Sequence, residues 1–334
     1  MKVAVLHGPR DLRIEDEPDL SADPEPNQIR VRTLVTGLSA GTELNVYTRR
    51  FGDAFYGWNK SLPTELGYLN VGRVAAVGAG VTGVQPGDVI YTRKGHRQEH
   101  LISQDELFWK VPAGLRPEVA VFTYLINLGL HALRRGGLIP GEHVAVVGLG
   151  PIGLGAVAMA RTFGSPVVGI DPVAERRELA CHVGVDAALD PTAGDFPDAI
   201  AAFGGEAGID LVVETASTWS AIRTAAEVVR QEGRVSIVAL HPGEAEYNPI
   251  GEPFYRKQLA LISTSFAPLE DYPSQRVRFT LRRNCQYILD GLAAGRIGYA
   301  PAVTHEVHFS ELPAIFERLA EGDRTMGAVA VHWE

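Results

Sequence analysis

The chain has 334 residues, of which 46% are hydrophobic and 21% are charged, and its formal net charge is −9. This composition is typical of a globular protein with room for two domains, and the negative charge argues against nucleic acid or an anionic membrane as a partner. Two cysteines are too few for a disulfide framework or a cysteine-based zinc site. No apolar run approaches the ~20 residues that span a bilayer, and the N-terminus lacks a signal-peptide core, so we expect a cytoplasmic protein.

The first third of the chain is predicted to be rich in β-strands. Residues 1–8, 28–40 and 71–92 alternate or run apolar with many β-branched side chains, and Gly and Pro mark the corners. From 117 to 137 the apolar residues recur at helical spacing. Strands are then expected at 143–149, 165–171, 208–216 and 234–240, separated by helices at 151–164, 174–184 and 219–233. This alternation predicts an α/β protein with a doubly wound parallel sheet. An apolar run at 257–266, a long helix at 272–295 and a helix at 311–322 follow.

Residues 143–171 carry the pattern of a dinucleotide-binding turn. An apolar strand runs into Gly148, Gly150 and Gly153, which would allow a tight turn, backbone approach to a pyrophosphate and helix–strand packing. The helix that starts at Pro151 and Ile152 offers its N-terminal N–H groups to the phosphates. Asp171 ends the next strand, where a carboxylate accepts hydrogen bonds from the adenosine ribose and repels a 2′-phosphate. The motif therefore predicts a site for NAD.

Two further strand ends are expected to meet the nicotinamide half of the cofactor. Thr215 and Ala216 follow one strand, and Leu240 follows the next. Ligands of open α/β sheets bind at the carboxyl ends of the strands. We therefore assign the backbone at these three residues to cofactor binding.

The β-rich start, the GLGPIG turn and the phrases VGRVAAVGAGVTGVQPGDVI, DLVVETAS and EGRVSIVAL resemble the medium-chain dehydrogenase/reductase superfamily. The resemblance implies a GroES-like β-rich catalytic domain at 1–122 and 272–334 and a Rossmann domain at 123–271, with nicotinamide between them. Related NAD-using chains have an arginine five residues after the acid, as Arg176 follows Asp171 here. The resemblance also implies a homodimer paired through an edge strand of the Rossmann sheet, supplied by 234–240 and 257–266.

The chain departs from the zinc-dependent members of this superfamily. Ser39 falls at the position of a metal-binding cysteine, Tyr68 replaces the histidine of a Gly-His-Glu motif, and Tyr124 lies near the third ligand. Zinc prefers thiolate, imidazole or carboxylate ligands, so three hydroxyl side chains predict a site without metal. The string Ser39 to Glu43 resembles a branch with bacteriochlorophyllide-type hydroxyethyl dehydrogenases and sugar oxidoreductases.

Without zinc, a side chain must take the hydroxyl proton of an alcohol. We expect His96 to do so, with a surface histidine as the alternative, and Tyr68 is the second candidate, with simple space filling as its alternative. Thr42 matches a hydroxyl that relays protons in zinc-dependent relatives, or it bonds the local backbone. Glu43 orients His96 or a substrate hydroxyl, or it caps a helix near residue 44.

Four residues are candidate substrate contacts. Ser39, Tyr124 and Asn127 are placed in the cleft by the resemblance. Tyr47 belongs to an aromatic and basic loop with Phe51, Phe55, Tyr56 and Trp58, for which core packing is the favoured alternative.

These features favour a zinc-independent, NAD-dependent alcohol dehydrogenase that acts on a secondary alcohol of a sugar, cyclitol or biosynthetic intermediate. One alternative is an NADPH-dependent quinone or enoyl reductase of the same superfamily, against which Asp171 argues. Another is a non-catalytic dinucleotide-binding protein. The sequence leaves the substrate open.

Overall fold

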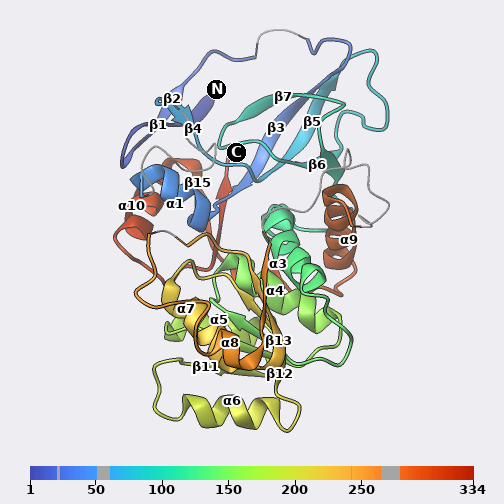
Figure 1. Cartoon of the computed structure of the whole chain (residues 1–334). Helices are drawn as coiled ribbons and strands as arrows, with labels where there is room; N and C mark the ends of the chain where they lie inside the picture. Colours follow the sequence, from blue (N-terminus) through green and yellow to red (C-terminus); the bar gives the residue numbers. More distant parts are fainter. Residues whose placement is uncertain (21–22, 51–60, 242, 265–278) are drawn as a thin grey trace. The chain divides into compact units, whose positions relative to one another are not determined.

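A computed structural model describes the chain except residues 21–22, 51–60, 242 and 265–278. It divides into two compact units (Figure 1). Unit 1 comprises Met1–Thr123 and Val303–Glu334, and unit 2 comprises Tyr124–Ala302. The first boundary lies within one residue of the expected one. The second follows residue 302 and not residue 271, so the helix after Thr280 belongs to unit 2.

Unit 1 contains two sheets. A seven-stranded sheet has the order β15-β16-β3-β5-β6-β8, with β7 also paired to β3, and a three-stranded sheet has the order β2-β1-β4. The pairs are antiparallel apart from β15 and β16, which run parallel. The strands are β1 (Lys2–Gly8), β2 (Asp11–Asp16), β3 (Gln28–Gly37), β4 (Thr64–Glu65), β5 (Asn70–Val77), β6 (Val89–Thr92), β7 (Glu99–Ser103), β8 (Phe108–Lys110), β15 (Val303–His308) and β16 (Ala328–His332).

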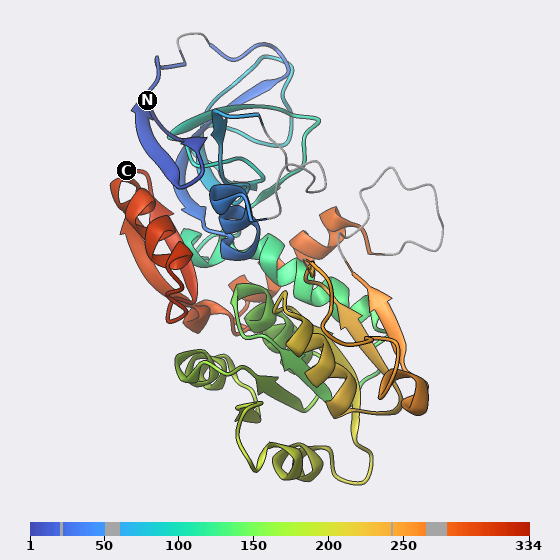
Figure 2. The same ribbon diagram turned by 60° about the vertical axis from the view of Figure 1, so that its left-hand side comes forward.

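The helices of unit 1 are short and bury one face each. They are α1 (Ala40–Thr48), α2 (Pro117–Ala120), α10 (Leu312–Ala320) and the 3-10 turn η3 (Phe309–Glu311). In α10 the apolar residues Leu312, Ile315, Phe316 and Leu319 follow helical spacing and pack in one core with residues of α1 and β16. Figure 2 shows the red helix α10 beside the C-terminal strands. This packing joins the C-terminal segment to the first helix.

Unit 2 is built on a six-stranded parallel sheet with the order β11-β10-β9-β12-β13-β14. The strands are β9 (Val144–Val147), β10 (Val167–Ile170), β11 (Ala187–Leu189), β12 (Ile209–Glu214), β13 (Val229–Ile237) and β14 (Ala260–Ser263). Counted from β9, this is the 3-2-1-4-5-6 order of a dinucleotide-binding sheet, in which ligands bind where the order reverses. The fold class expected from the sequence is confirmed.

Helices accompany these strands in Figure 1. They are α3 (Thr123–Arg135, whose first residue lies in unit 1), α4 (Pro151–Thr162), α5 (Ala174–Val183), α6 (Phe196–Gly204), α7 (Trp219–Val228), α8 (Phe254–Lys257), α9 (Leu281–Ala293) and the 3-10 turn η2 (Ala300–Ala302). None of the described helices is long and apolar enough to cross a membrane.

Two helix boundaries differ from expectation. The helix expected to reach residue 233 ends at Val228, because Lys257 Nζ donates to the carbonyl oxygens of Ala226 and Val229 at 3.2 and 2.8 Å and the chain then continues as β13. The helix expected over 272–295 spans Leu281–Ala293, and residues 272–278 lie outside the described part of the chain.

Helix α9 belongs to unit 2 because it packs against α3. Asn284 Nδ2 donates to Asn127 Oδ1 at 2.8 Å, Arg134 donates to Asn284 Oδ1, and all of Asn284 and Asn127 is buried. A buried amide pair of this kind fixes the two helices against each other, because leaving either amide unpaired costs about 1–3 kcal/mol.

Candidate active site

The glycine turn after β9 has the geometry that a dinucleotide requires. Gly148 has φ +90°, which favours glycine, and a Cβ at this residue would lie 2.9 Å from the Ala216 Cβ. A Cβ at Gly153 would lie 1.9 Å from the Gly148 carbonyl oxygen, so any side chain there would displace the turn. A Cβ at Gly150 would meet no heavy atom within 4 Å. The first and third glycines therefore close the turn, and the second leaves an open face.

Helix α4 begins at this open face. Its N-cap is Gly150, no side chain caps it, and Pro151 occupies the first helical position. Pro151 and Ile152 are partly buried at the start of a helix whose later residues are almost all buried. The N-terminal N–H groups of such a helix, with the positive end of its dipole, attract phosphate.

Asp171 directly follows β10 and is 3% exposed. Its Oδ2 accepts from the Leu149 N–H and its Oδ1 from the Val173 N–H, both at 2.9 Å. Arg176 Nη1 lies 3.7 Å from Asp171 Oδ2, and Arg177 pairs with Asp190 at 3.2 Å. The Asp171 carboxylate is therefore hydrogen-bonded to the backbone of the glycine turn. Arg176 lies beside Asp171, and Arg177 lies beside Asp190.

Thr215 and Ala216 follow β12, and Leu240 follows β13. Thr215 Oγ1 donates to the Gly148 carbonyl oxygen at 2.8 Å, and Ala216 packs against Gly148. Leu240 is 38% exposed beyond the end of β13. The side chain of Thr215 therefore holds the turn itself, a role that the sequence did not suggest.

In unit 1 a group of hydroxyl side chains lies at the start of α1. Ser39 precedes this helix and Thr42 lies in its first turn, while Tyr68 comes from the loop before β5. Ser39 Oγ and Tyr68 OH are 2.5 Å apart, and Tyr68 OH lies 3.5 Å from Thr42 Oγ1. The Arg93 guanidinium is 5.7 Å from the centre of the Tyr68 ring. The predicted site residues Ser39, Thr42 and Tyr68 therefore lie together, with the Ser39 and Thr42 hydroxyls next to the Tyr68 phenol.

A buried acid and a buried imidazole lie next to this group. Glu43 Oε1 accepts from the Ser39 N–H at 2.8 Å, and Glu43 Oε2 is 2.9 Å from His96 Nε2. The negative charge in the first turn of α1 also stabilises that helix. His96 Nδ1 is 2.8 Å from Thr36 Oγ1, which in turn accepts from Trp333 Nε1 at 2.8 Å.

These contacts correct the role expected for His96. The ring is 0% exposed and both of its nitrogens have protein partners, so neither nitrogen is left to take a proton from an alcohol. Its alternative, a surface histidine, is also wrong. Glu43 contacts His96 and accepts from the Ser39 N–H at the start of α1, which begins at Ala40 and not near residue 44.

Tyr47 is a core residue and not a substrate contact. It is 2% exposed, its ring centre lies 5.1 Å from that of Phe316, and its hydroxyl donates to Glu317 Oε2 at 2.8 Å. Burial, together with the bond to Glu317, raises the pKa of the Tyr47 hydroxyl to about 12. Four aromatic residues expected beside it lie outside the described residues, namely Phe51, Phe55, Tyr56 and Trp58.

Tyr124 and Asn127 belong to α3 of unit 2 and not to the hydroxyl group of unit 1. Tyr124 is 3% exposed and Asn127 is fully buried. Asn127 Oδ1 accepts from Asn284, so part of its amide serves the packing of α3 on α9.

The side chains around Tyr68 do not fit a zinc ion. Zinc requires ligands such as imidazole and carboxylate held about its tetrahedral positions. Next to the Tyr68 phenol, the His96 imidazole hydrogen-bonds the Glu43 carboxylate. Ser39 hydrogen-bonds Tyr68 itself. The donor atoms therefore face one another and not a common centre.

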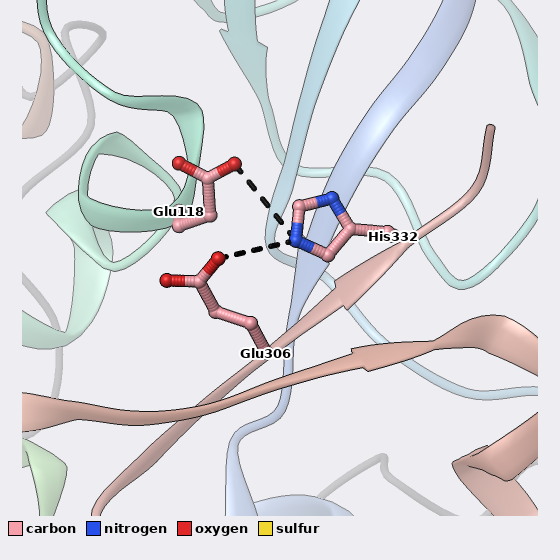
Figure 3. A group of neighbouring side chains, drawn as sticks. All are labelled: Glu118, Glu306 and His332. Atoms are coloured by element: carbon pink, nitrogen blue, oxygen red, sulfur yellow. Dashed lines mark ion pairs between the residues drawn. The ribbon is translucent and has the colours of Figure 1, made fainter.

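A second polar cluster in unit 1 joins three elements. Glu118 of α2, Glu306 of β15 and His332 of β16 direct their polar atoms toward one another (Figure 3). His332 Nε2 lies 3.5 Å from Glu306 Oε2 and 3.9 Å from Glu118 Oε1. The other carboxylate oxygens contact Arg116. Because Arg116 balances the acids, we interpret the cluster as an ion-pair network that ties α2 to the C-terminal strands.

Sequence reasoning missed Thr36 and Trp333. A threonine inside a strand and a tryptophan next to the last residue carry no motif, and only the pairing of β3 with β16 brings them together.

Comparison with known proteins agrees with this geometry. A family model described as zinc-binding dehydrogenase matches residues 151–280. Sorbitol dehydrogenase of Bacillus subtilis (strain 168) is 28% identical over 309 residues, which cover 82% of this chain and 84% of that protein. The crystal structure of galactitol-1-phosphate dehydrogenase from Escherichia coli has the same fold, with a TM-score of 0.82 at 20% identity over 100% of both chains. That of 2R,3R-butanediol dehydrogenase from Bacillus subtilis gives 0.81 at 21% identity over 100% of this chain and 99% of the other. The chain is therefore similar to members of the medium-chain dehydrogenase/reductase superfamily, and its family match lies within residues 151–280.

Proposed function

We propose that the protein transfers a hydride between NAD(H) and a secondary alcohol or its ketone without a metal ion. Similarity to this superfamily supports the coarser part, an oxidoreductase of alcohols and ketones with a nicotinamide cofactor. The observation that carries the proposal is the open face at Gly150, beside an uncapped helix N-terminus and a carboxylate tied to the same turn. Bound NAD would accept the hydride, and the chain's own residues must handle the proton.

Cofactor choice rests on Asp171. An ionised carboxylate accepts hydrogen bonds from ribose hydroxyls and repels a 2′-phosphate. Arg176 and Arg177 lie beside Asp171 and Asp190, so their charges are balanced by acids. This arrangement favours NAD over NADP, and we expect at least a tenfold lower Kd for NADH than for NADPH.

Tyr68 is the residue that we propose for proton transfer. Its hydroxyl bonds Ser39 and lies near Thr42, so a proton on the phenol has neighbours that accept or supply it. The Arg93 guanidinium, 5.7 Å from the centre of the Tyr68 ring, places a positive charge near this group. With His96 enclosed, Tyr68 is the remaining candidate of the two that the sequence suggested.

The substrate class is proposed from the relatives. The curated relatives include sorbitol dehydrogenase and L-galactonate-5-dehydrogenase of Escherichia coli (strain K12), which argues for a polyol or sugar acid with a secondary hydroxyl. A cyclitol or a larger biosynthetic intermediate has the same reacting group.

We also propose a homodimer. Among the described strands β14 ends the order of the Rossmann sheet, and its outer edge is the one that we propose for pairing with a strand from a second copy. β13, which the sequence also suggested for this edge, pairs on both sides with β12 and β14 and offers none. Sedimentation equilibrium gives twice the chain mass if the proposal holds.

The proposed function is tested by reduction of NAD and, in parallel, NADP with a panel of polyols, sugar acids and cyclitols, in excess chelator. We expect turnover with NAD that chelator does not change. Tyr68→Phe lowers kcat about a hundredfold or more with NADH binding retained, whereas Tyr47→Phe, which removes a buried hydroxyl elsewhere in unit 1, leaves kcat near wild type. Activity lost to chelator and restored by zinc contradicts the metal-free mechanism. Preference for NADPH with quinones or enones points to the reductase alternative, and NADH binding without turnover points to a non-catalytic protein.

A further inference from the structure

A continuous line of hydrogen bonds joins the end of the chain to the hydroxyl group of unit 1. It runs from Trp333 through Thr36 and His96 to Glu43, with donor–acceptor distances of 2.8, 2.8 and 2.9 Å. The four residues are between 0% and 2% exposed. Glu43 then continues the line to the Ser39 N–H at 2.8 Å.

The chemistry of the two ends fixes the direction of every bond in this line. An indole N–H only donates, so Thr36 Oγ1 must accept from Trp333. Glu43 accepts from the Ser39 N–H through Oε1, and as a carboxylate it also accepts through Oε2, so His96 Nε2 carries a proton toward Glu43. Thr36 keeps one hydroxyl proton, and His96 Nδ1 is the neighbouring acceptor at hydrogen-bond distance. If Nδ1 were protonated as well, the buried Thr36 proton would lose its acceptor, which costs about 1–3 kcal/mol.

We propose that Glu43 and Trp333 together set the tautomer of His96: Glu43 holds the proton on Nε2, and Trp333, through Thr36, keeps Nδ1 as an acceptor. The histidine is then a positioning residue, because the hydrogen bond on one ring nitrogen decides which proton the other carries.

The line has a consequence for the hydroxyl group, and this step rests on the proposed function. Glu43 holds the backbone of Ser39 at the start of α1, and the Ser39 hydroxyl bonds Tyr68. A displaced Glu43 therefore moves the partner of the proposed proton-transfer residue without touching the glycine turn of unit 2. Displacement of a reacting group by about 1 Å is enough to cost about a hundredfold in rate.

The tautomer is measured directly by ¹H–¹⁵N correlation spectra of the histidine rings at neutral pH, with His96 assigned by comparison with His96→Gln. We expect Nε2 protonated and Nδ1 unprotonated in the wild-type protein. Trp333→Phe frees Thr36 to rotate, so that Nδ1 gains a proton in part of the molecules while Nε2 stays protonated toward Glu43. Trp109→Phe alters another buried tryptophan of unit 1 and leaves the His96 signals unchanged. A wild-type ring with Nδ1–H or with both nitrogens protonated overturns the proposal, as does a Trp333→Phe spectrum identical to wild type.

Kinetics provide a second, independent readout through Thr36. Thr36→Ser keeps the hydroxyl and retains the wild-type tautomer and kcat, whereas Thr36→Val removes it and lowers kcat by about tenfold to a hundredfold with the Kd of NADH unchanged. Equal kcat values for the two variants overturn the positioning role. If the protein oxidises no alcohol, the proposed function fails, but the spectra still decide the tautomer. If Trp333→Phe does not fold, the Thr36 pair gives the same test.

Discussion

The two candidate sites of this protein are built in opposite ways. The dinucleotide turn of unit 2 comes mainly from one stretch of chain, between Val144 and Asp171, whose glycines make room for its backbone, and Thr215 and Ala216 support it from the next strand end. The hydroxyl group of unit 1 uses side chains from the strand β3, the helix α1, two loops and the C-terminus. A site made by local backbone can be recognised from spacing, whereas a site made by distant side chains requires the pairing of the strands that carry them.

The contrast explains which expectations failed. His96, expected to take the alcohol proton, is enclosed by partners more than 30 residues away, including Thr36. Tyr47, a candidate substrate contact for which core packing was the favoured alternative, is a core residue bonded to Glu317. The glycine motif is recognised from its spacing, whereas its contacts with Thr215 and Ala216 come from a later strand end.

The largest effect is expected from substitution of the glycines in the dinucleotide turn of unit 2. Gly153→Ala places a Cβ against the Gly148 carbonyl and destabilises unit 2 by about 2 kcal/mol or more, with loss of NADH binding. Gly150→Ala is the matched control, since its Cβ meets nothing and its φ of −74° suits alanine. It keeps the melting temperature but weakens NADH binding by filling the open face. Calorimetric melting and fluorescence titration separate the two effects, and equal behaviour of the variants contradicts the division of roles among the glycines.

A smaller effect is expected at the loop that carries Tyr68. Gly67→Ala places a Cβ 2.7 Å from His96 Cδ2 at a residue with φ +89°. Gly83→Ala introduces a similar backbone strain, about 1–2 kcal/mol, at φ +80° with no atom within 4 Å. We expect Gly67→Ala to lower kcat at least tenfold beyond Gly83→Ala, with NADH affinity unchanged. Similar kcat values would mean that His96 does not position the hydroxyl group.

The smallest effect is expected at Tyr47. Tyr47→Phe loses the bond to Glu317 and lowers the melting temperature by about 2–4 °C at neutral pH, with no change in kcat. The pKa of this hydroxyl is raised to about 12 in the folded protein and lies near 10 in the unfolded chain. Its contribution is therefore present below pH 10 and is lost as the pH rises toward 12, so the two proteins converge in melting temperature there. A constant difference across that range contradicts the assignment.

The sequence by itself determined the Rossmann unit, its glycine turn and the acid after β10, because helical and strand periodicity and the φ demands of glycine are local properties. Family resemblance also placed Ser39, Tyr68 and Tyr124 at the positions of metal ligands and Thr42 at that of a proton relay, and the structure brings Ser39, Thr42 and Tyr68 together in unit 1. Only the tertiary structure decided the packing of α9 on α3, the enclosure of His96 and the link from Trp333 to Glu43. These contacts form between side chains far apart in the sequence, when β3 pairs with β16 and α10 packs beside α1. The spacing of residues along the chain does not predict such long-range contacts.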